Sequence, residues 1–98
     1  MEDVKLQKEM SNFYKLLSDY SRLKIILSLL DNEKCVGDIE KEVVMSQTAV
    51  SYQLKILKRG HLVKFRREGK NIFYSIDDSH VTDIVKITIE HIKHQHEC

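Results

Sequence analysis

One segment of fifteen residues, 46–60, constrains the fold most tightly, because its pattern predicts a short helix with both ends marked. Ser46 suits the N-cap position, where a hydroxyl oxygen accepts a hydrogen bond from a free backbone N–H. Val50, Leu54 and Leu57 then recur at helical spacing and form one apolar face. Gly60 favours the end of the helix. The segment is therefore predicted to be a helix with one side buried.

The other side of this predicted helix is polar and suits a surface that reads DNA. Flat amides and small hydroxyls lie toward its N-terminal end, and lysines lie toward its C-terminal end. Amide and hydroxyl groups read base edges, whereas lysines neutralise phosphates. Base contacts are therefore expected from Gln47, Thr48, Ser51 and Tyr52. Phosphate contacts are expected from Lys55 and Lys58, and from the basic residues of the hairpin that follows, Arg66, Arg67 and Lys70.

Three further helices are predicted before this segment. Residues 5–18 and 20–30 carry apolar side chains at intervals of three or four, and Asp19 between them suits an N-cap. A short helix over residues 38–43 is followed by a two-residue turn. Residues 36–59 therefore form a predicted helix-turn-helix. In the second helix, the side chains expected to face inward are Leu23, Ile26, Leu27 and Leu30.

The hydrophobic period changes from 3.6 to 2 after the glycine that ends the fourth helix, which predicts two strands. Residues 62–67 alternate, and residues 72–76 form the returning strand. The turn between them contains Gly69, which accepts a positive φ. Because a two-stranded hairpin is only marginally stable alone, this one is expected to pack against the helices. A last helix is predicted to begin near Asp78 and to run into the C-terminal tail.

Charge is distributed unevenly along the chain. Residues 44–76 contain seven Lys or Arg and one Glu, a net charge of +6, whereas the whole chain carries +1. A basic centre between acidic flanks is typical of a protein that binds nucleic acid. The basic tip of the predicted hairpin has no packing role, which favours a wing beside a DNA-reading helix.

The length and composition limit the class of protein. A chain of 98 residues is expected to form a single domain over residues 1–98. Its 42% hydrophobic and 32% charged residues are typical of a globular protein. No apolar run reaches the ~20 residues of a membrane span, and the N-terminus has no secretory pattern, so we expect a cytoplasmic protein without a membrane partner. Cys35 and Cys98 indicate no disulfide framework.

Several short motifs, taken together and in order, resemble the ArsR/SmtB family of dimeric winged-helix repressors. They are LLSD at 16–19, RLKI at 22–25, CVGDI at 35–39, SQ at 46–47, VSYQLK at 50–55 and GHLV at 60–63. Tyr20 stands where the family usually has proline, and Tyr52 where it often has histidine. The resemblance implies a mainly α fold with a β-hairpin wing, a winged helix-turn-helix that forms a homodimer through its first and last helices. It also implies a repressor, not an enzyme, that binds double-stranded operator DNA.

The last predicted helix is rich in imidazole. His91 and His94 lie three residues apart and share one helical face, and Asp78 and His80 lie together at the helix start. His91 follows His80 by eleven residues, which is ~16 Å along a helix, so one chain cannot close a four-ligand site. Two antiparallel copies can, because each pair then faces the other pair of the partner. This spacing resembles the family's sensor site between helices.

Zn(II) is the metal that this donor set favours, since three imidazoles and one carboxylate suit tetrahedral coordination. Full coordination leaves no open position for water, which favours sensing over hydrolysis. His96 and Cys98 could add donors and shift the preference toward Ni(II), and Co(II) accepts the same ligands. Metal binding is expected to lower the affinity for operator DNA and so derepress genes of metal efflux or homeostasis.

Three alternatives remain open from the sequence. Cys35 could make the chain a sensor of a thiol or redox signal, with Cys98 as the second thiol, although Gly37 stands where a Cys-x-Cys pair would continue. The histidines could belong to a zinc-dependent hydrolase, against which full ligation and the short chain argue. They could also belong to a metal-buffering protein, against which the basic hairpin argues.

Overall fold

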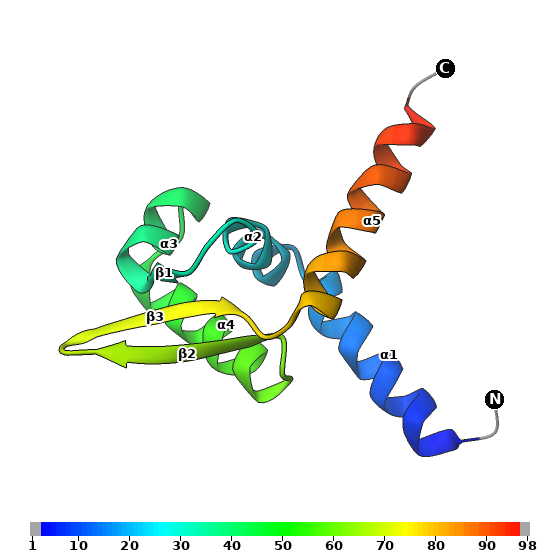
Figure 1. The fold of residues 1–98 in the computed structure, drawn as a ribbon, viewed down its shortest axis with the longest axis horizontal. Helices are drawn as coiled ribbons and strands as arrows, with labels where there is room; N and C mark the ends of the chain where they lie inside the picture. The colour runs from blue at the N-terminus through cyan, green and yellow to red at the C-terminus, as the bar shows by residue number, and fades with distance from the viewer. Residues whose placement is uncertain (1–2, 97–98) are drawn as a thin grey trace.

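The computed structural model describes residues 3–96 and consists of helices with one small sheet (Figure 1). Its elements are α1 (Val4–Ser18), α2 (Tyr20–Ser28), β1 (Lys34–Cys35), α3 (Val36–Val43), α4 (Gln47–Arg59), β2 (Val63–Glu68), β3 (Asn71–Ile76) and α5 (Ser79–Gln95). α3 and α4 form the helix-turn-helix, and the β2–β3 hairpin, called the wing below, contacts α4. The predicted mainly α fold with a hairpin wing is confirmed. Among residues 3–96, no helix combines the length and apolar character that crossing a membrane requires.

Side chains cap the N-terminal ends of α2 and α4 at the positions that the sequence predicts. The Ser46 hydroxyl accepts a hydrogen bond from the Ala49 N–H at 3.1 Å, and the Asp19 carboxylate accepts one from the Arg22 N–H at 3.1 Å. Each bond satisfies a backbone donor that has no partner inside the helix. The predicted starts of α2 and α4 are therefore confirmed.

The sheet contains one strand more than the sequence pattern predicts. Within residues 3–96 its order is β1-β3-β2, with both pairs antiparallel. β1 has two residues, too few for an alternating pattern to indicate a strand. The predicted hairpin turn is confirmed, because Glu68 pairs with Asn71 and Gly69 between them has φ 63°.

The buried core lies between α2, α3 and α4 and is closed by the base of the wing and the start of α5. The three apolar residues predicted to line one side of α4 are all buried, with at most 1% of their surface exposed. They pack with Ile39 of α3 and with Val81 and Val85 of α5. Val63, the first residue of β2, and Leu62 before it belong to the same core. This packing leaves the polar side of α4 facing outward.

Helix α2 turns a partly different face to the core from the one predicted. Ile26 is buried as expected, but Leu27 is 41% exposed, and Ile25 and Leu29 are buried as well. A helix that is apolar on several sides does not fix its own orientation from periodicity. Contacts of α2 with α3 and α4 select the side that carries Ile25 and Leu29. Leu27 is left facing α5.

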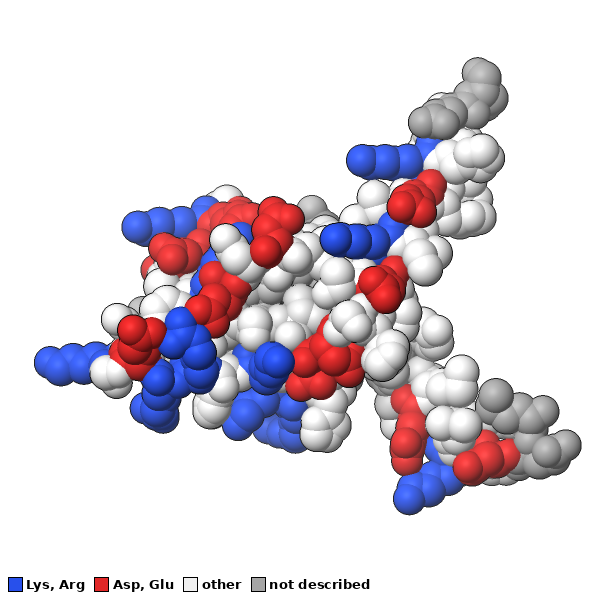
Figure 2. Space-filling model, in the orientation of Figure 1, with Lys and Arg blue, Asp and Glu red and all other residues white. Residues whose placement is uncertain are grey.

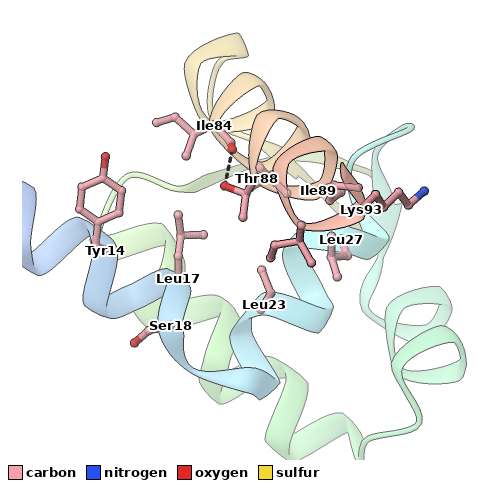
Figure 3. A pocket seen from close by; sticks show the side chains of 11 residues that line it. Tyr14, Leu17, Ser18, Leu23, Leu27, Ile84, Thr88, Ile89 and Lys93 are labelled. Carbon is pink, nitrogen blue, oxygen red and sulfur yellow. Dashed lines mark hydrogen bonds between the residues drawn. The ribbon is translucent and has the colours of Figure 1, made fainter. Parts of the chain in front are cut away.

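An apolar groove separates α1, α2 and α5 (Figure 3). Its volume is about 470 Å³. α1 has no buried residue, although apolar side chains recur along it at helical spacing. Apolar surface of this kind is typical of an interface. The groove is lined chiefly by Tyr14, Leu17, Leu23, Leu27, Ile89 and Ile92.

Two contacts tie the end of α1 to α4. A Cβ atom on Gly60 would lie 2.2 Å from Leu16 Cδ1, so a larger residue at position 60 would force the Leu16 side chain to shift. The Arg22 guanidinium donates from Nε to the Leu16 carbonyl at 2.9 Å and from Nη1 to Gln53 Oε1 at 3.2 Å. Gly60 caps α4 as predicted, with φ −87°, and the positive φ falls on the next residue, His61, at 63°.

The turn between α3 and α4 contains a strained residue. Val44 caps α3 in the left-handed region, with φ 56° and ψ 54°, and its side chain is 86% exposed. This region is unfavourable for a branched side chain because Cβ approaches the following carbonyl. No packing compensates for the strain, so the turn geometry is imposed by α3 and α4.

Replacing Val44 with glycine or asparagine is expected to stabilise the protein by about 1 kcal/mol, since both residues accept the left-handed conformation. Thermal unfolding followed by circular dichroism should show a midpoint several degrees higher, at about 4–8 °C per kcal/mol for a domain of this size. Val44→Ala keeps a Cβ atom and should give less. A lower midpoint for both Val44→Gly and Val44→Asn would contradict the strain argument.

Candidate functional site

The outward side of α4 carries the residues predicted to read bases. All of them are exposed, and Tyr52 has 63% of its surface accessible. Together they surround a shallow hollow of about 440 Å³. The hollow presents amide and hydroxyl groups beside one aromatic ring, which are groups that contact base edges and thymine methyls. The lining residues are Gln47, Thr48, Ser51, Tyr52 and Lys55.

The wing lies beside this helix and continues its charge. Lys58 Nζ, near the end of α4, lies 4.3 Å from the centroid of the Phe65 ring in β2, a cation–π contact that joins helix and wing. Arg67 and Lys70 are exposed toward the tip of the hairpin. Figure 2 shows Lys and Arg side chains gathered over the wing and α4, with acidic side chains over α3. The helix and the wing thus form one basic face.

Arg66 differs from the other basic residues of this face because it is paired with carboxylates. Its Nε donates to both carboxylate oxygens of Glu33, at 2.9 and 3.1 Å, and its Nη2 also contacts Glu33. Its Nη1 donates to Glu68 Oε2 at 2.6 Å. The hydrogen bonds from Arg66 hold the pKa of Glu33 below its usual value, and those to Glu33 and Glu68 raise the pKa of Arg66. The sequence gives no signal for this ion pair, since 33 residues separate Glu33 from Arg66.

The structure brings together the two candidate metal ligands at the start of α5. Asp78 caps the helix, and its Oδ1 accepts hydrogen bonds from the His80 N–H at 2.9 Å and the Val81 N–H at 3.3 Å. His80 Nδ1 lies 3.5 Å from the same oxygen. All three contacts involve Oδ1, so Oδ2 can still bind a metal ion. These hydrogen bonds, chiefly that from Val81, hold the pKa of Asp78 below its usual value.

The other candidate ligands lie at the far end of the same helix. His91 and His94 are exposed, and His91 Nε2 lies 3.3 Å from the side-chain nitrogen of Gln95. His96 follows the end of α5, and Cys98 lies outside the described residues. Within residues 3–96 of one chain, no three His, Cys, Asp or Glu side chains are close enough to hold a metal ion. The candidate ligands among residues 3–96 could therefore complete a site only together with ligands from elsewhere, such as a second chain.

Cys35 belongs to the sheet, where it pairs with Phe73 of β3. It is half-buried in β1, and its thiol donates to Asp38 Oδ2 at 3.3 Å. Cys35 is the residue that precedes α3, so the thiol lies at the start of that helix. The second thiol that a redox pair would need, Cys98, is not among the described residues.

Substitutions of Asp78 should separate its capping role from the metal-binding role predicted for it. Asp78→Ala removes the cap and is expected to cost about 0.5–2 kcal/mol of stability, whereas Asp78→Asn keeps the capping oxygen and should unfold near the parent temperature. Both should weaken metal binding, measured by Zn(II) titration. The pKa of Asp78 is lower in the folded protein than in the unfolded chain. Ionised Asp78 therefore stabilises the fold above the pKa of the unfolded chain, and this contribution is lost as the pH falls through the pKa of the folded protein. Equal stability of Asp78→Ala and the parent would rule out the capping role.

A helix-turn-helix whose second helix is exposed and flanked by a basic hairpin defines a winged-helix DNA-binding domain. The chain belongs to the arsR family of bacterial regulatory proteins, whose family model matches residues 19–64. It is 38% identical over 86 residues to a transcriptional repressor SmtB homolog of Synechocystis sp., a match that covers 88% of this chain and 65%, just under two thirds, of that relative. It is 37% identical over 84 residues to a cadmium resistance transcriptional regulatory protein CadC homolog of Staphylococcus aureus, covering 85% and 69% of the two chains.

The fold is also similar to solved structures of DNA-binding domains. The solution structure of the homodimeric winged helix-turn-helix DNA-binding domain Mb0332 from Mycobacterium bovis has a TM-score of 0.82 and 31% identity, with 100% of this chain and 96% of that chain covered. The family and these relatives are DNA-binding transcriptional regulators. The chain is therefore a regulator and not an enzyme, and the zinc-hydrolase alternative is wrong.

Proposed function

We propose that the chain is a homodimeric repressor that binds double-stranded operator DNA and releases it when a transition metal, first of all Zn(II), binds between the α5 helices of the dimer. The observation that carries the proposal is that two exposed pairs of candidate ligands, Asp78 with His80 and His91 with His94, lie at opposite ends of α5. The name of the cadmium resistance relative supports a metal as the signal. The regulated genes are then those of metal efflux or homeostasis.

The dimer is proposed to form through α1 and α5. One side of α5 carries His80, Ile84, Ile87, His91 and His94 at alternating intervals of four and three, here called the α5 stripe. Such spacing keeps one seam facing a partner helix. Antiparallel pairing about a two-fold axis near Ile87 places His80 opposite His94 of the partner. Ile87 is 63% exposed in one chain, and a partner would cover it together with the apolar groove.

The donor set fits a metal ion that accepts nitrogen and oxygen. Two imidazoles from one chain, and one imidazole with the free Oδ2 of Asp78 from the other, supply four ligands for tetrahedral Zn(II) or Co(II). Addition of His96 would raise the coordination number, as Ni(II) prefers. Two-fold symmetry gives two equivalent sites in each dimer.

The DNA contacts are proposed for the basic face of each protomer. Gln47, Thr48, Ser51 and Tyr52 would read bases, with Lys55, Lys58, Arg67 and Lys70 on phosphates. Two recognition helices must lie about one DNA turn, ~34 Å, apart to bind a two-fold operator. A metal that fixes the α5 pair at another spacing would weaken binding, and a coupling of ~1–3 kcal/mol changes the affinity ~5–150-fold.

Contacts at the start of α5 support a short connection through which metal binding could affect α4, the recognition helix. The Asp77 N–H donates to the Leu62 carbonyl at 3.0 Å, so the residue before Asp78 is bonded to the segment that follows α4. His61 and His80 line one groove of about 410 Å³ with Gly60 and Asp78. We propose that a ligand imidazole, His91 of the partner, donates its second N–H to a backbone carbonyl near Gly60 or His61.

The test is fluorescence anisotropy of the protein on a palindromic DNA selected from random sequence, titrated with Zn(II), Co(II) and Ni(II). Release at about one metal per protomer, with intense tetrahedral d–d bands of Co(II), would support the proposed site. Best release by Ni(II), with weak octahedral bands, would include the tail residues among the ligands. DNA affinity that stays the same with all three metals would overturn the proposed metal response and favour a signal at Cys35.

A further inference from the structure

We propose that Arg66 anchors the wing to the first strand of the sheet through Glu33 and does not contact phosphate, so that Arg67 and Lys70 alone carry the wing's phosphate contacts. The inference rests on the proposed DNA-binding face, and it reassigns one of the residues expected from the sequence to bind phosphate. Glu33, which the sequence pattern does not single out, becomes a positioning residue for the wing.

The sheet topology explains why Arg66 reaches Glu33. β3 lies between β2 and β1, and Phe73 of β3 is paired with Arg66 on one side and Cys35 on the other. The Arg66 guanidinium lies over the Phe73 ring, with Cζ 4.7 Å from the ring centroid. From there it bonds to Glu33, which precedes β1. The side chain therefore crosses the central strand and joins the two edges of the sheet.

Alternation along β2 places the neighbouring arginine on the other face. Val63 is buried, and Phe65 contacts Lys58 of α4, so the face of β2 that carries these two residues points toward the recognition helix. Arg67 shares that face because side chains two residues apart lie on the same side of a strand. Arg66 points to the opposite face, away from α4. The two adjacent arginines thus have different surroundings.

The donors of Arg66 are occupied on both edges of the guanidinium. Nε and Nη2 bind Glu33 as a bidentate pair, the geometry that a phosphate would otherwise use, and Nη1 binds Glu68. The three groups together carry one net negative charge. A phosphate that displaced Glu33 would leave a carboxylate unpaired beside the DNA, and the two anions would repel each other. The pair therefore serves the wing, whose hairpin is marginally stable alone.

The salt dependence of DNA binding tests this assignment, because the slope of log K against log salt is negative and each lost phosphate contact reduces its magnitude by ~0.9. In a homodimer one substitution removes two contacts, so Arg67→Gln and Lys70→Gln should each reduce the magnitude of the slope by up to ~1.8. Arg66→Gln should weaken binding by the same factor at every salt concentration and leave the slope unchanged. A reduction in the magnitude of the slope for Arg66→Gln equal to that for Arg67→Gln would overturn the inference. An unchanged slope for all three variants would overturn the proposed wing contact with DNA itself.

If Arg66→Gln disturbs folding, exchanging the charges of residues 33 and 66 provides a second test. In a Glu68→Gln background, Glu33→Arg and Arg66→Glu should each weaken DNA binding, and the double variant should recover most of the affinity with the slope of its background. Recovery follows if the ion pair positions the wing. If Arg66 binds phosphate, the double variant places a glutamate against the phosphate, and binding should stay weak.

Discussion

The Ile87→Glu variant is expected to be a folded monomer that binds operator DNA at least about 100-fold more weakly than the parent. Ile87 lies at the centre of the α5 stripe and is 63% exposed in a single chain. In a two-fold interface the central residue faces its own copy, so the substitution sets two carboxylates against each other. A monomer carries one recognition helix, and the loss of the second site removes an avidity of about 10²–10⁴.

Sedimentation velocity and anisotropy on the same DNA measure the two effects together. Ile87→Leu keeps the apolar contact and is the matched control, expected to remain dimeric with near-parent affinity. Circular dichroism should show that Ile87→Glu keeps its helices, because this side chain contributes nothing to the core of one protomer. A dimeric Ile87→Glu with full DNA affinity would place the interface elsewhere.

The His94→Ala variant is expected to bind operator DNA like the parent and to lose its release by Zn(II). His94 lies on α5, away from the basic face, and it shares a helical face with His91 as one half of the proposed site. Three remaining ligands bind zinc far more weakly, so the ~5–150-fold drop in affinity that metal would cause should disappear.

Lys86→Ala is the matched control for this variant. Lys86 is an exposed residue of α5 outside the α5 stripe, so its loss should leave release intact. His96→Ala measures the contribution of the tail and should matter only if six-coordinate Ni(II) is the metal. Release of DNA by Zn(II) from His94→Ala at the parent concentration would remove the α5 histidines from the mechanism.

The positions of the helices in this protein are largely predictable from local sequence. Asp19 and Ser46 cap α2 and α4 at the predicted residues, because capping needs only a side-chain oxygen and a backbone N–H three residues apart. The buried side of α4 and the glycine in the hairpin turn also follow from spacing and from φ. These features depend on neighbours within a few residues, so the sequence pattern predicts them.

Other features depend on contacts between distant segments. The two-residue strand β1 exists because β3 offers it an edge, and the ion pair of Glu33 with Arg66 follows from that pairing. The burial of Ile25 in place of Leu27 is set by where α3 and α4 pack. Gly60 caps α4 as predicted, but its close contact with Leu16 becomes visible only when α1 is placed against it.

The candidate functional residues also differ in whether local sequence or long-range contacts determine their surroundings. Residue types and a helical period are enough to predict the candidate metal donors and their spacing. Which arginine of the wing is paired with a carboxylate depends on long-range contacts, because two adjacent residues of a strand point to opposite faces and meet different partners. Long-range packing also buries one side of α5 and leaves the other side, with both pairs of candidate ligands, open to solvent.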